Sequence, residues 1–316
     1  MPDGLTRARL TAIRYAAHET NLYEFTRLDG APWPDAAPGA HIDLHLPNGM
    51  MRQFSLVRPG AAPQTYVVGV KRDRASRGGS IQVHDGLRVD DELDIGGPRN
   101  NFPLDENASH SVLFAGGIGV TPIMCMIERL EALGRSWRLY YSCRSRAETA
   151  FLRELQAKGE RVTFNFDAEN GGKFLDLPAI AAASPKDAHL YCCGPTPMLK
   201  AFEAATASWP RAQVHVEYFT AAEAPATDGG YIVELRRSGR EIVVPQGKTI
   251  LEALREAGIE VTTSCEEGVC GACETAVISG TPDHRDMILT ASERAASRTM
   301  MICCSGCKSE RLVLDL

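Results

Sequence analysis

The chain lacks three features that would assign it to common protein classes. It has no uninterrupted apolar run of about eighteen residues, so no membrane-spanning helix is predicted. Its formal net charge is −6 at pH 7, which argues against the broad basic surface of nucleic-acid-binding proteins. Its first residues contain no apolar signal segment, so a cytoplasmic location is predicted. In that compartment the ten cysteines are not expected to form disulfides.

Four of these cysteines have a spacing that is typical of one cofactor. Cys265, Cys270 and Cys273 form the pattern C-x4-C-x2-C, and Cys303 follows after a long gap. This is the plant-type spacing for a [2Fe-2S] cluster, whose fourth cysteine comes from far along the chain. Glycine and alanine lie between the ligands, where small residues let backbone amides approach sulfur. The spacing therefore predicts a [2Fe-2S] cluster and one-electron transfer.

The alternative is a zinc ribbon. Cys270 with Cys273, and Cys304 with Cys307, are two CxxC pairs, but a zinc site would leave the first cysteine of the pattern without a role. Cys303 and Cys304 are adjacent, and neighbouring side chains of an extended strand point to opposite faces. We therefore take Cys303 as the fourth ligand and interpret Cys304 and Cys307 as packing or surface thiols. Three further thiols in apolar surroundings are expected to be core residues: Cys125, Cys143 and Cys192.

The segments around the cysteine pattern predict a small α+β unit. Residues 231–244 read as a hairpin with a Ser-Gly turn. Thr249 and Glu252 form a capping box at the start of a helix that ends at Gly258, and residues 311–316 form a closing strand. Hairpin, helix, cysteine loop and final strand resemble a ferredoxin of the β-grasp type.

A glycine-rich loop follows a buried strand in the middle of the chain. Ser111 is followed by four apolar residues, 112–115, as expected of a strand in a parallel sheet, and Gly116, Gly117 and Gly119 come directly after them. Thr121 is predicted to cap the next helix. Glycines between a strand and a helix N-terminus let backbone amides approach a pyrophosphate. Later strands alternate with helical stretches, which predicts a doubly wound α/β sheet.

A second turn in this region carries Cys193, Gly194 and Pro195. Together with the glycine loop it resembles the nicotinamide half of the ferredoxin–NADP reductase superfamily, where this turn would line the nicotinamide site. We expect Cys193 to be a small side chain near the ring and not a nucleophile, because hydride transfer needs none. An earlier strand ends at Arg144 and Ser145, where an acid would favour NADH and arginines NADPH. Both signs of charge occur there, so the residues alone leave that choice open.

The N-terminal region is predicted to be all-β, from turn signals and alternating strands. His41 and His45 fall on the polar face of one strand and are expected to face solvent. Four residues further on resemble the flavin signature Arg-x-Tyr-Ser-Leu of the same superfamily: Arg52, Phe54, Ser55 and Leu56. The arginine can bind the flavin phosphate, and the aromatic side chain can lie beside the flavin ring. The serine hydroxyl and the backbone can bond to the polar edges of that ring. Phe54 in place of tyrosine keeps the stacking and loses one hydroxyl.

A further anion site is predicted after the next strand, which ends at Val70 and Lys71, two more candidate cofactor-binding residues. The loop that follows leads into a short helix and supplies four candidate residues: Arg77, Gly78, Gly79 and Ser80. An arginine, paired glycines and a serine at a helix start can bind one phosphate. No second segment for an adenosine is evident, so FMN is predicted rather than FAD.

The order of flavin barrel, nicotinamide domain and ferredoxin resembles the phthalate dioxygenase reductase family over nearly the whole chain. Residues 97–103 and the closing Leu-Val-Leu-Asp-Leu also match that family. The resemblance implies FMN, NADH and a plant-type cluster, with Thr121 facing both flavin and nicotinamide and Phe219 near the flavin. Family members often carry an aspartate where Ser145 stands, so NADPH stays an alternative.

The predicted architecture is multidomain. Residues 1–105 form an FMN-binding β-barrel, 106–222 a doubly wound NAD-binding α/β domain, 223–228 a linker, and 229–316 a β-grasp ferredoxin domain of the α+β class.

The predicted function is that of a reductase for a Rieske non-haem iron oxygenase acting on an aromatic acid or aryl ether. It would take hydride from NADH onto FMN and pass single electrons through the [2Fe-2S] cluster to the oxygenase. No catalytic side chain is expected, because the cofactors carry the chemistry. The protein is expected to be a monomer without nucleic-acid or membrane partners. Three alternatives remain. The protein could be a reductase for another electron acceptor, a reductase that acts directly on small molecules, or a redox-sensing module.

Overall fold

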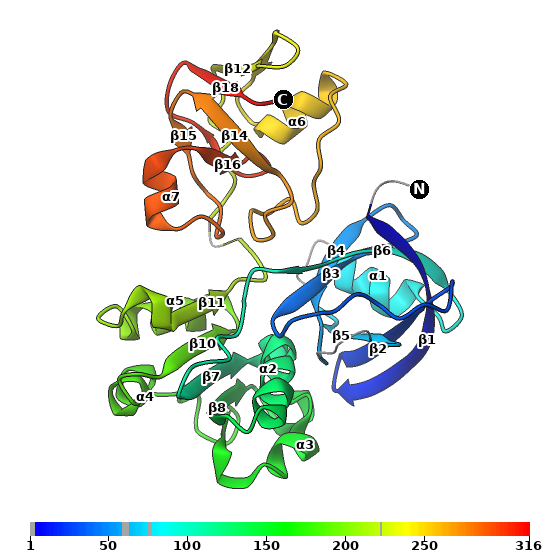
Figure 1. The fold of residues 1–316 in the computed structure, drawn as a ribbon, viewed down its shortest axis with the longest axis vertical. Coiled ribbons are helices and arrows are strands. Elements are labelled where there is room, and N and C mark those ends of the chain that lie inside the picture. The colour runs from blue at the N-terminus through cyan, green and yellow to red at the C-terminus, as the bar shows by residue number, and fades with distance from the viewer. Residues whose placement is uncertain (1–3, 59–62, 75–77, 222) are drawn as a thin grey trace. The chain divides into compact units, whose positions relative to one another are not determined.

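The computed structural model describes residues 4–58, 63–74, 78–221 and 223–316. The chain forms two compact units, Met1–Glu217 and Tyr218–Leu316. The first unit contains an antiparallel sheet and a parallel sheet, and the second contains a mixed sheet (Figure 1). No helix among the described residues has both the length and the apolar character needed to cross a membrane.

The antiparallel sheet forms the predicted barrel. Its strands are β1 (Leu5–Ala17), β2 (Thr20–Arg27), β3 (Ala40–His45), β4 (Met51–Ser55), β5 (Tyr66–Lys71) and β6 (Glu92–Asn100), in the order β4-β3-β6-β1-β2-β5. An antiparallel bridge from Leu56 to Val68 joins the two outer strands, so the sheet curls round its apolar core. Helix α1 (Gly79–Gly86) follows β5. The barrel and its short helix confirm the predicted fold of this region.

One expectation for the barrel is wrong. His41 and Asp43 on the polar face of β3 are only 5% and 4% exposed, whereas His45 at the end of the strand is partly exposed. Arg99 forms an ion pair with Asp43 at 2.7 Å, and Gln53 donates a hydrogen bond to the same carboxylate. Alternation of polar and apolar residues marked the two faces correctly, but it could not show that both faces are covered.

The parallel sheet has the order β11-β10-β7-β8-β9, as expected for a doubly wound fold. Its strands are β7 (His110–Gly116), β8 (Ser136–Cys143), β9 (Val162–Phe166), β10 (His189–Cys193) and β11 (Val214–Glu217). Its helices are α2 (Val120–Ala132), α3 (Leu152–Gln156), α4 (Leu177–Ala183) and α5 (Thr196–Ala205). Both faces of β7 are buried: Leu113 belongs to the core that includes α2, while the ring of Phe114 contacts Phe202 of α5. This explains the continuous apolar run of the strand.

The second unit has the predicted β-grasp arrangement. Its elements are β12 (Tyr231–Leu235), β13 (Arg240–Val244), α6 (Ile250–Glu256), β14 (Glu274–Ser279), β15 (Pro282–Asp283), α7 (Ala291–Ala296), β16 (Thr299–Met301), β17 (Gly306–Cys307) and β18 (Arg311–Leu314). The main sheet has the order β13-β12-β18-β14-β16. Thr249 and Glu252 make the predicted capping box at the start of α6. Apolar residues of α6 pack on this sheet and form the core.

Candidate cofactor sites

The four cysteines of the predicted cluster site are brought together in the second unit. Cys265, Cys270, Cys273 and Cys303 are all buried. Hydrogen bonds from Cys270 and Cys303 lower the pKa of Cys265, and the same contacts raise the pKa of Cys270 and Cys303. Thiols this close cannot all ionise unless nearby positive charge offsets their repulsion. Iron supplies that charge, so the donor set fits a cluster.

The cluster loop, residues 262–273, contains no helix or strand and aims backbone amides at sulfur. The amide of Glu267 donates to Cys265 Sγ at 3.3 Å, and the amide of Ala272 to Cys270 Sγ at 3.4 Å. Positive φ angles at Glu266 (57°) and Gly268 (70°) turn the backbone for this purpose. Such bonds favour the thiolate form that binds iron. Among the described residues no three His, Cys, Asp or Glu side chains are spaced to hold a single ion, so the fit rests on the two-iron ligand pattern.

Cys304 supports this loop from a neighbouring turn. A Cβ atom added to Gly268 would lie 2.4 Å from Cys304 Sγ, so only glycine fits above this thiol. Cys303 and Cys304 occupy a turn after β16 and not an extended strand, so the expected alternation of faces does not apply to them. Cys303 nevertheless contacts Cys265 and Cys273, as the choice of fourth ligand requires. Cys304 donates to the Met301 carbonyl at 3.7 Å and Cys307 to the Ser309 carbonyl at 3.0 Å, so each of these two thiols has a backbone partner of its own.

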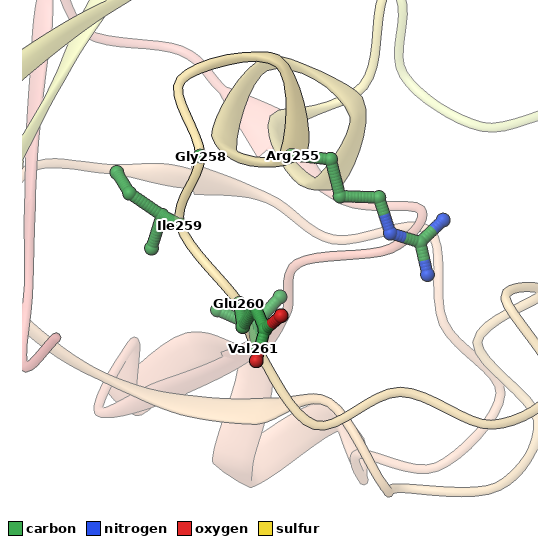
Figure 2. A pocket seen from close by; sticks show the side chains of 5 residues that line it. All are labelled: Arg255, Gly258, Ile259, Glu260 and Val261. Carbon is green, nitrogen blue, oxygen red and sulfur yellow. The ribbon is translucent and has the colours of Figure 1, made fainter.

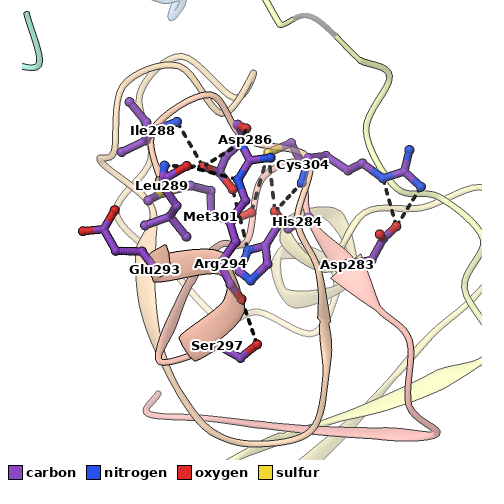
Figure 3. Close-up of polar contacts among 12 residues, drawn as sticks. Asp283, His284, Asp286, Ile288, Leu289, Glu293, Arg294, Ser297, Met301 and Cys304 are labelled. Carbon is purple, nitrogen blue, oxygen red and sulfur yellow. Dashed lines mark hydrogen bonds and ion pairs between the residues drawn. The ribbon is translucent and has the colours of Figure 1, made fainter. Parts of the chain in front are cut away.

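A buried carboxylate fixes the segment that contacts Gly268 (Figure 3). The Asp286 side chain is fully buried and accepts hydrogen bonds from the amides of Ile288 at 3.0 Å and Leu289 at 2.7 Å. Arg294 donates to the Asp286 and Leu289 carbonyls. The amide of Met287 then donates to the Gly268 carbonyl at 2.8 Å. Sequence reasoning missed this support, because nothing in the pattern marked Asp286 as buried.

The outer side of the cluster loop is held by Arg255, at the end of α6. This arginine pairs with Glu266 at 2.5 Å and donates to Thr263 Oγ1 at 3.0 Å. It also lines a pocket with residues 258–261 (Figure 2). The ion pair therefore holds Glu266 in its left-handed conformation, next to the predicted ligand Cys265.

The two predicted nicotinamide motifs meet in the first unit. A Cβ added to Gly119 would lie 2.3 Å from the Cys193 carbonyl oxygen, and one added to Gly116 would lie 2.5 Å from Pro195 Cδ. A Cβ added to Gly194 would lie 3.1 Å from the Cα atom of Gly116. Gly117 has a φ of 54° and open space where a side chain would be. The loop can thus expose its backbone to a ligand at the carboxyl end of the parallel strands.

Thr121 lies close to this loop but does not cap the helix as expected. Helix α2 begins at Val120, and the Thr121 hydroxyl donates to the Ile118 carbonyl at 3.0 Å. Its Cγ2 would be 2.7 Å from a Cβ on Gly69 of β5. Thr121 therefore joins the nucleotide loop to the barrel, because its hydroxyl bonds to the loop while its methyl group packs against Gly69.

A carboxylic acid missed by sequence reasoning lies beside Cys193. Glu217 is buried, burial raises its pKa to about 8, and its Oε2 has no hydrogen-bond partner among the described residues. Burial also raises the pKa of Cys193, which keeps it a neutral thiol. The only signal in the sequence was an acid at the end of a buried strand. Cys193 and Glu217 therefore line the site with two uncharged groups, and Glu217 keeps its proton at neutral pH.

The predicted flavin residues gather at the barrel rim near the start of α1. A Cβ on Gly79 would lie 2.3 Å from Arg52 Nε, so the arginine lies across the glycine. Ser55 Oγ is buried and without a hydrogen-bond partner in the described part of the chain, as expected of a hydroxyl that serves a ligand. Phe54 is half-buried beside the barrel core. These residues fit a phosphate and a polar ring edge.

Other predicted flavin residues have roles of their own. The side chains of Leu56 and Val70 are buried in the barrel core, so only their backbone can contact a ligand. Lys71 pairs with Glu148 at 3.1 Å. Ser80 Oγ accepts the amide of Asp73 at 3.0 Å. Gly78 precedes α1 with a φ of 88°, and Arg77 lies outside the described residues.

Three predicted cofactor-binding residues belong neither to the nucleotide loop nor to the barrel rim: Arg144, Ser145 and Phe219. Arg144 is exposed at the end of β8, and the Ser145 carbonyl accepts a hydrogen bond from Thr149 Oγ1 at 2.8 Å. Phe219 belongs to the second unit and is 37% exposed. Its position near the flavin stays a prediction.

Comparison with known proteins places these sites in context. Residues 233–308 match the family model described as a 2Fe-2S iron-sulfur cluster binding domain. The chain is 53% identical to phenoxybenzoate dioxygenase subunit beta of Ectopseudomonas oleovorans, over 98% of this chain and 96% of that protein. It is 48% identical to tetrachlorobenzoquinone reductase of Sphingobium chlorophenolicum, over 97% of each.

A third relative carries the same name as one of the solved structures that the chain resembles. The chain is 39% identical to phthalate dioxygenase reductase of Burkholderia cepacia, over 99% of this chain and 98% of that protein. The solved phthalate dioxygenase reductase, described as a modular structure for electron transfer from pyridine nucleotides to [2Fe-2S], superposes with a TM-score of 0.76 at 39% identity, over 99% of this chain and 98% of its own. The likeness extends over both units.

Proposed function

Because this chain belongs to the phthalate dioxygenase reductase family, we propose that it is the reductase component of an oxygenase system. It takes reducing equivalents from NADH through FMN and a [2Fe-2S] cluster, and delivers single electrons to a protein partner. The observation that carries this proposal is the presence, in one chain, of a buried four-thiol set and a strand–helix nucleotide loop. Neither site alone would require electron splitting.

Each cofactor has a set of residues that would hold it. FMN would be held by Arg52, Ser55 and the start of α1, and NADH by the loop 116–119 with the turn 193–195. The four cysteines would bind the cluster. When bound, these groups supply hydride acceptance and one-electron transfer.

The protein's own task is to position these groups and to set their surroundings. Gly116 and Gly119 keep the Cys193 turn close, so the nucleotide loop is formed before any ligand arrives. Cys193 and Glu217 present a neutral surface there, because burial raises the pKa of both. At the cluster, the amides of Glu267 and Ala272 stabilise negative charge on sulfur.

The partner is a Rieske-type non-haem iron oxygenase that acts on an aromatic acid or aryl ether. Support comes from relatives named for phenoxybenzoate and phthalate dioxygenase systems. The protein acts as a cytoplasmic monomer that meets this partner transiently. Gel filtration with and without the oxygenase tests this assignment, and a stable complex or a dimer would contradict it.

The relay is tested by anaerobic titration with NADH, followed in the visible spectrum. Bleaching of the flavin followed by reduction of the cluster is expected, and a cluster that never reduces would refute the relay. Steady reduction of cytochrome c by NADH would rule out a pure sensing module.

Replacing Cys303 by serine tests the order of the relay. Cys303→Ser should lose reduction of cytochrome c but keep reduction of ferricyanide at the flavin. Cys307→Ser is the matched control, because this thiol contacts Ser309 and not the four ligands. It should keep both activities.

A second function is favoured by the 48% identity to tetrachlorobenzoquinone reductase. In this case the protein would reduce a quinone directly. Quinone reduction that survives in Cys303→Ser would place that reaction at the flavin, whereas its loss would place it after the cluster.

A further inference from the structure

The carboxyl ends of two parallel strands, β8 and β9, lie side by side next to Arg144 and Ser145, where the choice between NADH and NADPH is expected to be made. The amide of Asp167 donates to the Cys143 carbonyl and the amide of Ala168 to the Arg144 carbonyl, both at 3.0 Å. These bonds continue the pairing of β8 with β9 beyond the ends of both strands. The loop after β9 is therefore held alongside residues 144–146, where a dinucleotide fold places the adenosine ribose.

Within this contact, the guanidinium of Arg146 is already occupied. Its Nε and Nη2 donate to the two carboxylate oxygens of Glu169 at 2.7 and 2.9 Å. The guanidinium also lies over the Phe166 ring, 4.4 Å from the centroid. The fork geometry that suits a phosphate is thus used for a carboxylate of the chain itself.

The acid is held in place by an ordered loop. Asn165 is buried, and its amide nitrogen donates to the Lys173 carbonyl at 3.1 Å and to Asp167 Oδ1 at 3.2 Å. Its oxygen accepts from Asn170 at 2.8 Å, and the amide of Gly172 donates to the Asp167 carbonyl at 2.9 Å. Glu169 lies within the segment that these bonds close.

The pair has little value for stability alone. Arg146 and Glu169 are 54% and 45% exposed, and ion pairs at such positions contribute little to folding. The geometry is nevertheless specific, with two parallel hydrogen bonds and a ring beneath the arginine. A role in choosing the ligand explains this arrangement better than a role in folding.

We propose that Glu169 is a specificity-determining residue that makes the site select NADH over NADPH. It occupies Arg146, so this arginine cannot bind a 2′-phosphate, and it places negative charge where that phosphate would lie. A ribose with a free 2′-hydroxyl avoids this repulsion. The inference rests on the proposed use of NADH and adds the residue that enforces it.

The test uses the full-length protein with its flavin and cluster. Glu169→Gln keeps the size of the side chain and removes the charge. The ratio of kcat/KM for NADPH to that for NADH, measured by ferricyanide reduction, should rise by about tenfold or more, as expected for one charge-assisted contact. Calorimetry with 2′,5′-ADP and ADP should show tighter binding of the 2′-phosphorylated compound to the variant. The double variant Glu169→Gln with Arg146→Ala should lose both gains.

A matched pair supplies the control. Arg129 binds Glu106 through the same two hydrogen bonds, at 2.8 and 2.7 Å, away from the carboxyl ends of the strands. Glu106→Gln should leave the ratio unchanged. A ratio in Glu169→Gln within twofold of the unsubstituted protein would overturn the inference, as would a gain that survives removal of Arg146. If the unsubstituted protein failed to oxidise either nucleotide, the proposed function itself would fail instead.

Discussion

The cluster loop, residues 262–273, and the nucleotide loop, residues 116–119, reach their shapes by opposite means. The cluster loop has no regular structure and depends on local contacts from Arg255, Cys304 and the Asp286 segment. The nucleotide loop is fixed by its place between β7 and α2 and by the neighbouring turn of β10. The first needs many separate side-chain contacts, whereas the second follows from the topology of the sheet.

The largest effect is expected at the nucleotide loop, from Gly119→Ala. Its φ of −60° suits alanine, but the new Cβ would lie 2.3 Å from the Cys193 carbonyl oxygen. Because a backbone atom cannot rotate away, we expect a loss of about 3 kcal/mol in the free energy of unfolding. Urea denaturation of the full chain measures this. Gly117→Ala is the control: it meets open space, and its φ of 54° should cost only about 1 kcal/mol. Equal effects would contradict a topological origin for the shape of this loop.

The same region should carry a pH dependence through Glu217. Its pKa is about 8 in the folded protein, against an ordinary value of 4.5. Between these values the unfolded chain is ionised and the folded chain is protonated, so stability falls as pH rises. The slope from this group is roughly 1.4 kcal/mol per pH unit, and it levels off above the folded pKa.

Glu217→Gln removes this group from the titration. The variant should lose that slope between pH 5 and pH 7, roughly the interval in which the two states differ in protonation. Urea unfolding at several pH values measures the difference between the two proteins. Parallel stability curves would show that Glu217 ionises normally in the folded protein.

At the cluster loop, Gly268→Ala should cost about 2 kcal/mol, from its left-handed conformation and from crowding. Its φ is 70°, and the new Cβ would lie 2.4 Å from Cys304 Sγ. Release of iron to a chelator should become faster. Adding Cys304→Ala removes the sulfur atom. The double variant should therefore regain the stability lost through crowding, but not the stability lost through the left-handed conformation. Full recovery would mean that conformation contributes nothing.

The smallest effect is expected from Arg255→Ala. Its pair with Glu266 is partly exposed, so the loss should be below about 1 kcal/mol and should shrink further in high salt. The rate of iron release measured at low and high salt tests this. Lys248→Ala breaks the Lys248–Glu256 pair, which includes no residue of the cluster loop, and is the control. An equal change in both variants would remove any special role for Arg255.

The sequence was sufficient where a local pattern of residue types and spacing specifies a structure by itself. The cysteine spacing predicted the four thiols that meet, and the capping box at Thr249 predicted the start of α6. It failed where burial depends on distant segments. Thr121 had the chemistry of a cap, but the helix begins one residue earlier. The burial of Glu217 and Asp286 was not predicted, because only the folded chain shows what covers these acids.

Strand β18 is late in the sequence but central in its sheet, between β12 and β14. During synthesis the cysteines at 265, 270, 273 and 303 leave the ribosome before this strand does, while the first unit can already fold. We therefore expect that the cluster site is complete only once residues 311–314 have joined this sheet, although they are not among the proposed ligands. A chain cut before Arg311 should take up no cluster, as measured by its iron content, although its flavin half should still turn yellow.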